Sequence, residues 1–162
     1  MALPGTEPPK PMVERVPEPT YKSLKDLHAY WLARKGDLAA PPRSAIRPED
    51  LVAMLPHVAL IDVVGDAPQF RFRVFGTGLV EAYGQELTGK FDHEVDLNSV
   101  GPDIIGQLTA VVVECRPNVV RIRFTKDGDG RYLQYERLAL PLADDGKDVN
   151  KILLGYVVEK TS

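Results

Sequence analysis

Residues 57–75 read HVALIDVVGDAPQFRFRVF and contain the pattern that decides the fold. The first eight are nearly all apolar, as in an inner strand of a sheet, and Gly65 to Pro68 form a turn signal. Residues 69–75 then alternate, which predicts a strand with one buried face. One face should carry Phe70, Phe72 and Val74, and the other Arg71, Arg73 and Phe75. The stretch therefore predicts an antiparallel hairpin.

Three more strands are expected near the C-terminus, over residues 118–125, 131–142 and 151–159. The first alternates apolar residues with arginine, as the hairpin does. Clusters of Asp and Gly at 127–130 and 144–147 are typical of the turns that join antiparallel strands.

Between these two groups of strands, six glycines divide residues 76–115 into short pieces. We expect a short helix over 79–83, an irregular stretch through His93, and a longer helix from about Pro102 to Cys115. Val111 to Val113 is unusual in a helix, so a strand is the alternative there.

The beginning of the chain has a different character. Residues 1–20 hold six of the fourteen prolines, which excludes a helix or an inner strand. We expect a disordered, proline-rich lead, with a docking tail as the alternative, followed by a single domain over residues 21–162. That domain should open with a helix capped by Ser23 and Asp26 and ended by Gly36, with Leu24, Leu27 and Trp31 as its buried stripe. A short helix should follow Pro48, over 49–55, and end at Pro56.

Composition limits the classes of function. The chain has 162 residues, enough for one domain, and 20 Lys and Arg against 23 Asp and Glu give a net charge of −3. This mildly acidic balance argues against a nucleic-acid binder. The single cysteine, Cys115, excludes an internal disulfide and a multi-cysteine zinc site. With no long apolar run and no secretory signal, we expect no membrane association and a cytoplasmic location.

Two strands, helices and three strands make an α+β fold with an antiparallel sheet. This order resembles a PAS domain. Residues 75–90, FGTGLVEAYGQELTGK, are similar to the PAS pattern in which a helix ends at an aromatic-glycine pair, here Tyr83-Gly84, before a Glu-Leu-x-Gly-Lys turn at 86–90.

The chain also resembles a bacterial, mainly proteobacterial, family of stand-alone PAS-like proteins over about residues 21–159. The marks are Tyr30-Trp31, Pro42 near Arg43, Leu55-Pro56, residues 70–77 and residues 135–142. Pro42 directly precedes Arg43, whereas the family pattern has one residue between them.

The resemblance implies a five-stranded antiparallel sheet with helices on one face, an N-terminal flanking helix, and a ligand pocket between sheet and helices. Mainly apolar walls with a few orienting polar groups are typical of such pockets. The candidate ligand-binding residues are Phe72, Val74, Leu79, Tyr83, Ile122, Phe124, Tyr135 and Tyr156. The alternative is a fully packed core without a cavity. The sequence does not identify a ligand or cofactor.

Arginines on the predicted strands are the least expected feature, because Arg is suited to binding carboxylates and phosphates. Alternation places Arg71, Arg73, Arg121 and Arg123 on the face opposite the pocket. There they should pair with acids or pack under the leading helix. Glu136 and Arg137 are adjacent and must point to opposite faces.

Other candidates for chemistry are weaker. His93 lies among acids but should be in a solvated loop rather than a metal or haem site. Cys115 is best interpreted as a small buried hydrophobe, and the cysteine motif of flavin-binding light sensors is absent. Gly76-x-Gly78 lacks the third glycine of a dinucleotide fingerprint.

We therefore expect a non-enzymatic sensory or signalling module that binds a small ligand, a protein partner or both, with a homodimer through the N-terminal helix as one route for its output. One alternative is a small-molecule enzyme or carrier whose pocket contains Tyr83, His93 and Tyr135. Another is an interaction scaffold with a filled core and no ligand.

Overall fold

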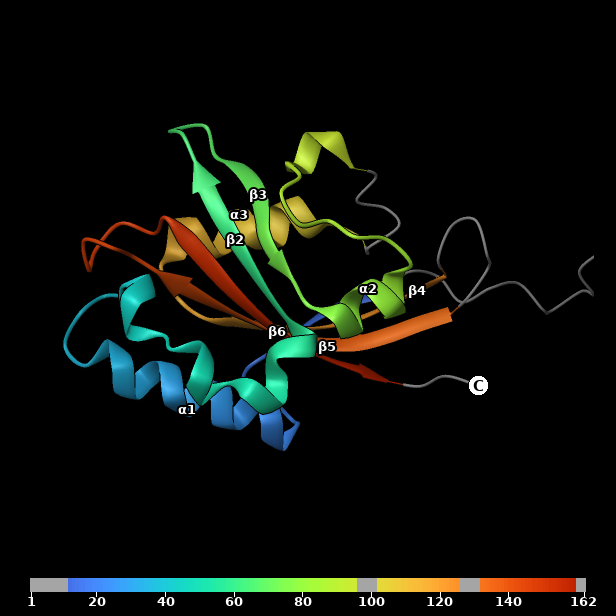
Figure 1. Cartoon of the computed structure of the whole chain (residues 1–162), viewed down its shortest axis with the longest axis horizontal. Coiled ribbons are helices and arrows are strands. Elements are labelled where there is room, and N and C mark those ends of the chain that lie inside the picture. Colours follow the sequence, from blue (N-terminus) through green and yellow to red (C-terminus); the bar gives the residue numbers. More distant parts are fainter. Residues whose placement is uncertain (1–11, 96–101, 126–131, 160–162) are drawn as a thin grey trace, which may run out of the picture.

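The computed structural model describes residues 12–95, 102–125 and 132–159. Its centre is one antiparallel sheet of six strands in the order β1-β4-β5-β6-β2-β3 (Figure 1). The strands are β1 (Met12–Val16), β2 (Val58–Val64), β3 (Gln69–Phe75), β4 (Asn118–Thr125), β5 (Tyr132–Leu142) and β6 (Lys151–Glu159). The α+β class and the antiparallel sheet are confirmed.

The sheet has one strand more than expected. β1 comes from the proline-rich lead and pairs with β4, with Val13 opposite Ile122. It contains no proline itself, and as an edge strand it does not need all of its backbone donors. Residues 12–16 are therefore regular, in contrast to the expected disorder of this stretch.

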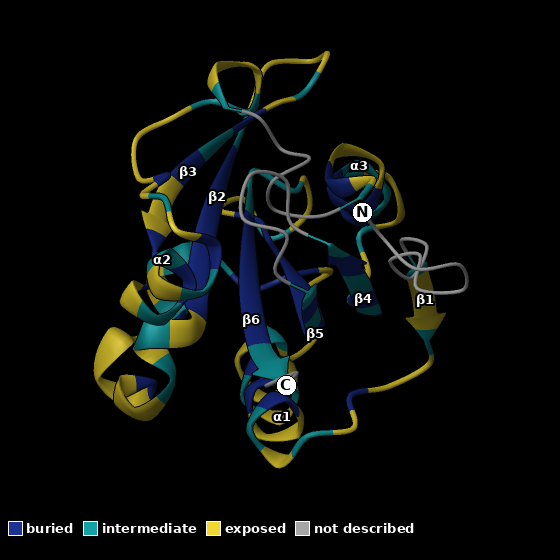
Figure 2. Cartoon of the chain, turned by 90° about the vertical axis from the view of Figure 1, so that its right-hand side faces the viewer, coloured by how far each residue is buried: buried dark blue, intermediate teal, exposed yellow. Residues whose placement is uncertain are grey.

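Helices cover both faces of the sheet. One face carries α1 (Lys22–Lys35) and three 3-10 helices, at Arg43–Ala45, Pro48–Asp50 and Val52–His57. The other carries α2 (Thr77–Tyr83) and α3 (Ile104–Glu114). A fourth 3-10 helix spans Asp92–Glu94. Each face therefore has its own apolar core, and the strands between them are mostly buried (Figure 2).

α1 packs on its own sheet through the expected stripe of Leu24, Leu27 and Trp31. The Trp31 indole Nε1 donates to the carbonyl of Pro141 at 2.8 Å. Gly155 on β6 allows this close approach, because a Cβ there would lie 2.6 Å from Leu27 Cδ2. The helix ends at Gly36 as expected, with a φ of +54°.

The expected cap at Ser23 is wrong, because the residue before α1 is Tyr21 and no side chain caps it. Instead, the carboxylate of Glu136 on β5 accepts hydrogen bonds from the backbone N–H groups of Thr20 (2.9 Å) and Tyr21 (3.4 Å). A long-range contact thus anchors the start of α1, and no local motif signals it.

A register shift in β3 changes the faces of its last residues. Leu60 pairs with Val74 while Ile61 pairs with Phe72, so Arg73 is the extra residue of a bulge. Val74 therefore turns to the α1 face, and Phe75 enters the core with α2 and α3. The predictions for these two residues were wrong, because strict alternation assumes an unbroken strand.

Most other elements lie where they were expected. Val111 to Val113 are helical, which resolves the choice between helix and strand. The predicted helix at 49–55 is two 3-10 helices, and the second runs through Pro56. The predicted turn at 127–130 lies outside the described residues.

Candidate functional site

Seven of the eight predicted wall residues lie together in the core between the sheet, α2 and α3. They are Phe72, Leu79, Tyr83, Ile122, Phe124, Tyr135 and Tyr156. We call this set, with its neighbours in the same core, the inner core. Val74 is the exception, because the bulge in β3 places it on the other face of the sheet.

The turn from β3 into α2 positions Tyr83. Gly76 packs so closely on the preceding 3-10 helix that a Cβ would lie 2.4 Å from the carbonyl oxygen of Pro56. A Cβ at Gly78 would lie 2.8 Å from both the Pro56 carbonyl oxygen and His57 Nε2. The Gly-x-Gly pair therefore allows close packing, and the seven-residue α2 then places Tyr83, its last residue, in the inner core.

Three tyrosine rings meet in this core. Tyr83 contacts Tyr135 edge to face, with centroids 5.9 Å apart, and contacts Tyr156 at 6.5 Å. The rings of Tyr135 and Tyr156 are 5.4 Å apart. Such edge contacts between rings favour one arrangement beyond simple burial.

Arg137 lies in the same core and is 0% exposed. It follows Tyr135 by two residues on β5 and pairs in register with Tyr156 on β6. Its Nη1 donates to Gln107 Oε1 on α3, and its Nη2 donates to Asn118 Oδ1 on β4 at 2.7 Å. Both partners are neutral amides, and in the part of the chain that the structure describes no carboxylate pairs with Arg137.

The electrostatics of this cluster are unusual. Burial lowers the pKa of Arg137, and the three tyrosines partly oppose that effect. Burial also raises the pKa of Tyr83 well above its ordinary value, and that of Tyr156 to about 12. The phenols therefore stay neutral near pH 7 and supply no negative charge. A buried guanidinium that is held only by neutral groups is costly unless an anion joins it.

Two polar atoms of the inner core have no hydrogen-bond partner of good geometry, Arg137 Nε and the Tyr83 hydroxyl, although the neighbouring Tyr135 is close enough to help raise the Tyr83 pKa. Buried polar groups in proteins are nearly always bonded, so an exception needs an explanation. Both atoms belong to groups that donate hydrogen bonds. The cluster can thus offer donors and one positive charge to a small molecule.

Sequence reasoning missed Arg137 as a site residue. The available signal was its spacing of two from Tyr135, which puts both on one face of the strand. What the sequence could not show is that its charge would have no carboxylate partner among the described residues.

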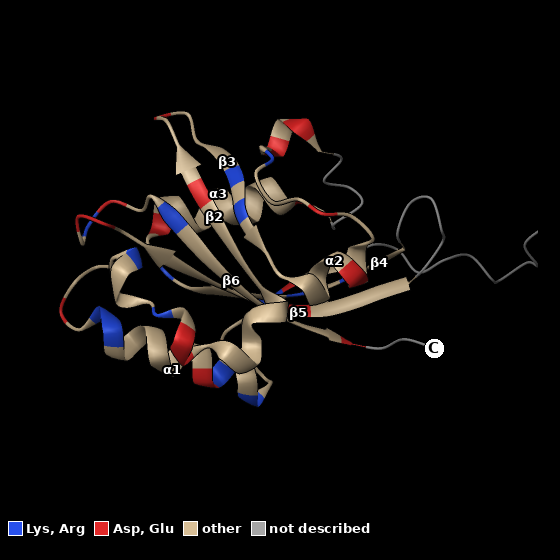
Figure 3. Ribbon diagram, in the orientation of Figure 1, with Lys and Arg blue, Asp and Glu red and all other residues tan. Residues whose placement is uncertain are grey.

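Three of the four arginines predicted for the opposite face bond acids there. Arg71 and Arg73 both bond the carboxylate of Asp62, at 2.8 and 2.9 Å, which Figure 3 shows as the red band on β2 beside blue bands on β3. Arg121 bonds Glu136 at 3.1 Å. These three arginines have acidic partners, which distinguishes them from Arg137. The fourth, Arg123, donates from Nη2 to Met12 Sδ at 3.7 Å, and its Nε has no hydrogen-bond partner in the described part of the chain.

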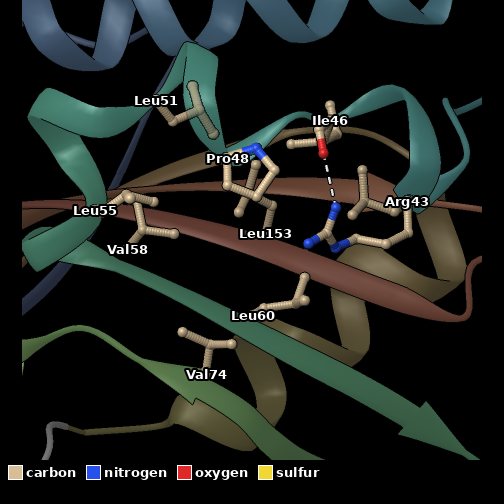
Figure 4. A pocket seen from close by; sticks show the side chains of 10 residues that line it. Arg43, Ile46, Pro48, Leu51, Leu55, Val58, Leu60, Val74 and Leu153 are labelled. Atoms are coloured by element: carbon tan, nitrogen blue, oxygen red, sulfur yellow. Dashed lines mark hydrogen bonds between the residues drawn. The ribbon is translucent and has the colours of Figure 1, made fainter.

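A hollow with a volume of about 220 Å³ lies on the α1 face of the sheet, outside the inner core (Figure 4). Nine of its lining residues are apolar, and Val74 is one of them. Its only charged lining residue, Arg43, donates from Nη1 to the carbonyl of Ile46 at 2.7 Å. This apolar pocket therefore lacks the unpartnered polar groups that make the inner core distinctive.

The remaining candidates from the sequence lie elsewhere. The His93 side chain is 60% exposed in the 3-10 helix Asp92–Glu94, outside the inner core that holds Tyr83 and Tyr135. Cys115 packs against the core on the α1 face of the sheet, which contains Leu24, Leu27 and Trp31 and which we call the α1-side core. Burial raises the pKa of its thiol. Within the described ranges, no group of three or more His, Cys, Asp or Glu could hold a metal ion. Those ranges also contain no helix that is long and apolar enough to cross a membrane.

Comparison with known proteins agrees with this fold. A family model described as "PAS domain" matches residues 20–158. An RNA-binding light-oxygen-voltage receptor is structurally similar, with a TM-score of 0.53 and 13% identity over 93% of this chain and 39% of that chain. The light state of the blue-light photoreceptor Aureochrome1 LOV has a TM-score of 0.47 and 13% identity over 70% of this chain and 88% of that one.

No curated protein matches the sequence closely enough to count as a relative. At 13% identity, the similarity to the receptor concerns the fold alone, and this chain corresponds to 39% of the receptor's length.

Proposed function

Because this chain belongs to the PAS domain family, we propose that it is a non-enzymatic sensory module that binds a small ligand in its inner core. Phe72, Leu79, Ile122 and Phe124 supply apolar walls. The polar groups come from Tyr83, Tyr135, Tyr156 and Arg137. The observation that carries the proposal is the fully buried Arg137, which two neutral amides hold.

A merely structural role accounts poorly for this arginine. An apolar residue of similar volume would fill the core without the cost of taking a charge out of water. Retention of costly polar groups is typical of binding sites, where stability is given up for function. An enzyme is the weaker alternative, because His93 lies outside the inner core and is mostly exposed.

We propose that ligand binding is signalled to other proteins through α1. Glu136 and Arg137 are neighbours on β5, and Glu136 holds the start of α1 while Arg137 faces the inner core. If ligand binding moves the backbone of β5 at Arg137, Glu136 moves with it, because one peptide unit joins the two residues. The hydrogen bonds of Glu136 would then transmit this movement to the start of α1. The outer face of α1, which includes the half-exposed Leu32, is then the surface for a protein partner or a second copy.

Native mass spectrometry tests ligand binding most simply. The purified protein should show a mass excess over the denatured chain, released as a discrete small molecule on unfolding. A chain that carries no ligand, and whose melting temperature no small molecule raises in a broad metabolite screen, would contradict the proposal and leave the scaffold alternative.

Hydrogen exchange tests the route to α1. Ligand addition should change the exchange of amides 20–27 in the wild type, and Glu136→Gln should reduce that change while ligand affinity stays the same. Equal changes in both proteins would refute this route without affecting ligand binding.

Two further parts of the proposal rest on the sequence. Residues 21–162 act as one domain, which limited proteolysis would test. The motifs at Tyr30-Trp31 and residues 135–142 favour the bacterial stand-alone PAS-like group. A cytoplasmic location is a separate prediction from the sequence, which fractionation of the source cells would test.

A further inference from the structure

We propose that the inner core binds a small monocarboxylate with an apolar body, whose carboxylate pairs with Arg137. This inference rests on the proposed function and adds the chemical class of the ligand. It starts from the two buried donors without partners, Arg137 Nε and the Tyr83 hydroxyl. A carboxylate only accepts hydrogen bonds and has two oxygens to do so.

The charge of the site favours a single negative charge. Arg137 is the one arginine or lysine among the buried residues that the structure describes. Of the other strand arginines, Arg71 and Arg73 already bond Asp62, and Arg121 bonds Glu136. One guanidinium balances one carboxylate, whereas a phosphate dianion would bring a second charge into the core without a counterion.

The guanidinium is held in place for this role. Gln107 from α3 and Asn118 from β4 fix its Nη1 and Nη2 groups, and the Gln107 amide is itself held by the carbonyl of Pro102 at 3.0 Å. Two neutral acceptors orient the cation without cancelling its charge. A fixed, water-excluded donor binds an anion more strongly than a mobile surface arginine does.

The rest of the core determines the body of the ligand. The surroundings of the tyrosines are aromatic and aliphatic, with Phe124 6.5 Å from Tyr135 and Phe75 6.1 Å from Tyr83, measured between ring centroids. Such walls suit an aromatic or short aliphatic group. Tyr83 lies at the end of the short α2, so a change in its rotamer or in α2 gives the ligand its space.

Matched acids and amides test this inference by thermal shift and calorimetry. The probes are benzoate, phenylacetate and hexanoate, each compared with its primary amide, which has nearly the same size but no charge and one acceptor oxygen fewer. At least one acid should raise the melting temperature in a saturable way, with an affinity about 10- to 100-fold above that of its amide, as expected for a charge-assisted hydrogen bond.

Arg137→Gln is the informative variant, because it removes the charge but keeps an amide donor beside Gln107 and Asn118. This variant should fold, and it should bind each acid and its amide with the same affinity. Arg116→Gln is the control, since Arg116 is exposed, and it should keep the wild-type response. Circular dichroism of both variants checks folding.

The other outcomes are also decisive. If amides bind as well as acids, or if Arg137→Gln keeps the preference for acids, the carboxylate inference is wrong while ligand binding in the core stands. If no acid binds but native mass spectrometry finds a neutral ligand, the inference is again wrong and the proposed function holds. If neither probes nor native mass spectrometry reveal a ligand, both fail.

Discussion

Two neighbouring charges on β5 have opposite environments. Glu136 faces α1, where it accepts hydrogen bonds from Thr20, Tyr21 and Arg121. Arg137 faces the inner core, where only neutral amides hold it. Both residues are fully buried, so burial alone does not separate a structural charge from a functional one. In our proposal, the presence or absence of a counter-charge separates them.

Tyr83→Phe tests whether the Tyr83 hydroxyl is free to serve a ligand. We expect the free energy of unfolding to stay the same or rise by about 1 kcal/mol, because a buried hydroxyl without a partner is removed. Urea denaturation of the ligand-free protein measures this. A loss of more than about 1 kcal/mol would show that the hydroxyl is bonded within the protein.

Glu136→Gln tests the anchor of α1. Burial opposes the charge of Glu136, but the hydrogen bonds from Thr20 and Arg121 outweigh it and lower the pKa below the ordinary value of 4.5. A lowered folded pKa means that the stabilisation is present above pH 4.5 and is lost as the pH falls through the folded pKa. We expect a deficit of about 2 kcal/mol at pH 7, which shrinks in acid.

Urea unfolding of both proteins at several pH values between 3 and 7 measures this difference. Other carboxylates, such as Asp144 with a pKa of about 2, titrate equally in the two proteins and cancel. A deficit that is constant with pH would show that charge plays no part in the anchor.

At this scale, sequence reasoning succeeded where strands are regular. Alternation placed Phe72, Ile122 and Phe124 on the face of one core, and it placed Glu136 and Arg137 on opposite faces. The other wall residues followed from the family resemblance. It failed at Val74, because a bulge adds one residue and reverses the faces beyond it. The unpaired state of Arg137 depends on which distant side chains reach it, which no local pattern encodes.

Among the elements, α2 depends on the close contact at Gly76. Gly76→Ala should destabilise the protein by about 3 kcal/mol, because the new Cβ would meet backbone carbonyls rather than a movable side chain. Gly89→Ala is the control, with a φ of +84° but open space around it, and should cost about 1 kcal/mol. Chemical denaturation measures the free energy of unfolding of both variants. An equal loss in the two variants would show that Gly76 does not pack closely against the Pro56 backbone.

α1 depends on Trp31. We expect Trp31→Ala to lower the free energy of unfolding by about 3 kcal/mol or more, since it removes the largest side chain of the α1-side core and its hydrogen bond to Pro141. Leu32→Ala is the control on the same helix, because Leu32 is 50% exposed. It should change stability by less than about 0.5 kcal/mol. A cost below 1 kcal/mol for Trp31→Ala would be inconsistent with this packing.

Element positions were predictable wherever apolar periodicity was strong, as in β3, β4 and β6, whose bounds match the expected ranges. The cap of α1 was not predictable, because it is a side chain more than a hundred residues away. β1 was missed because the surrounding prolines dominated the interpretation. Only its pairing with β4 makes this short segment a strand.

At the scale of the whole molecule, one sheet separates two cores of different composition. The α1-side core is built of aliphatic residues and Trp31, and the strand carboxylates beside it, Asp62 and Glu136, are paired with arginines. The inner core contains the tyrosines and Arg137. β5 carries both Arg137 and Glu136, so in our proposal it is the strand that links a change around Arg137 to the start of α1.

The Nε–H signal of Arg137 in a nitrogen-15 NMR spectrum tests this account most directly. The signal, assigned by its loss in Arg137→Gln, should be protected from exchange with water and should shift downfield when phenylacetate, benzoate or hexanoate saturates the protein, but not with the matched amide. An Arg137 signal that stays in place while an acid demonstrably binds would contradict the assignment of the ligand to the inner core.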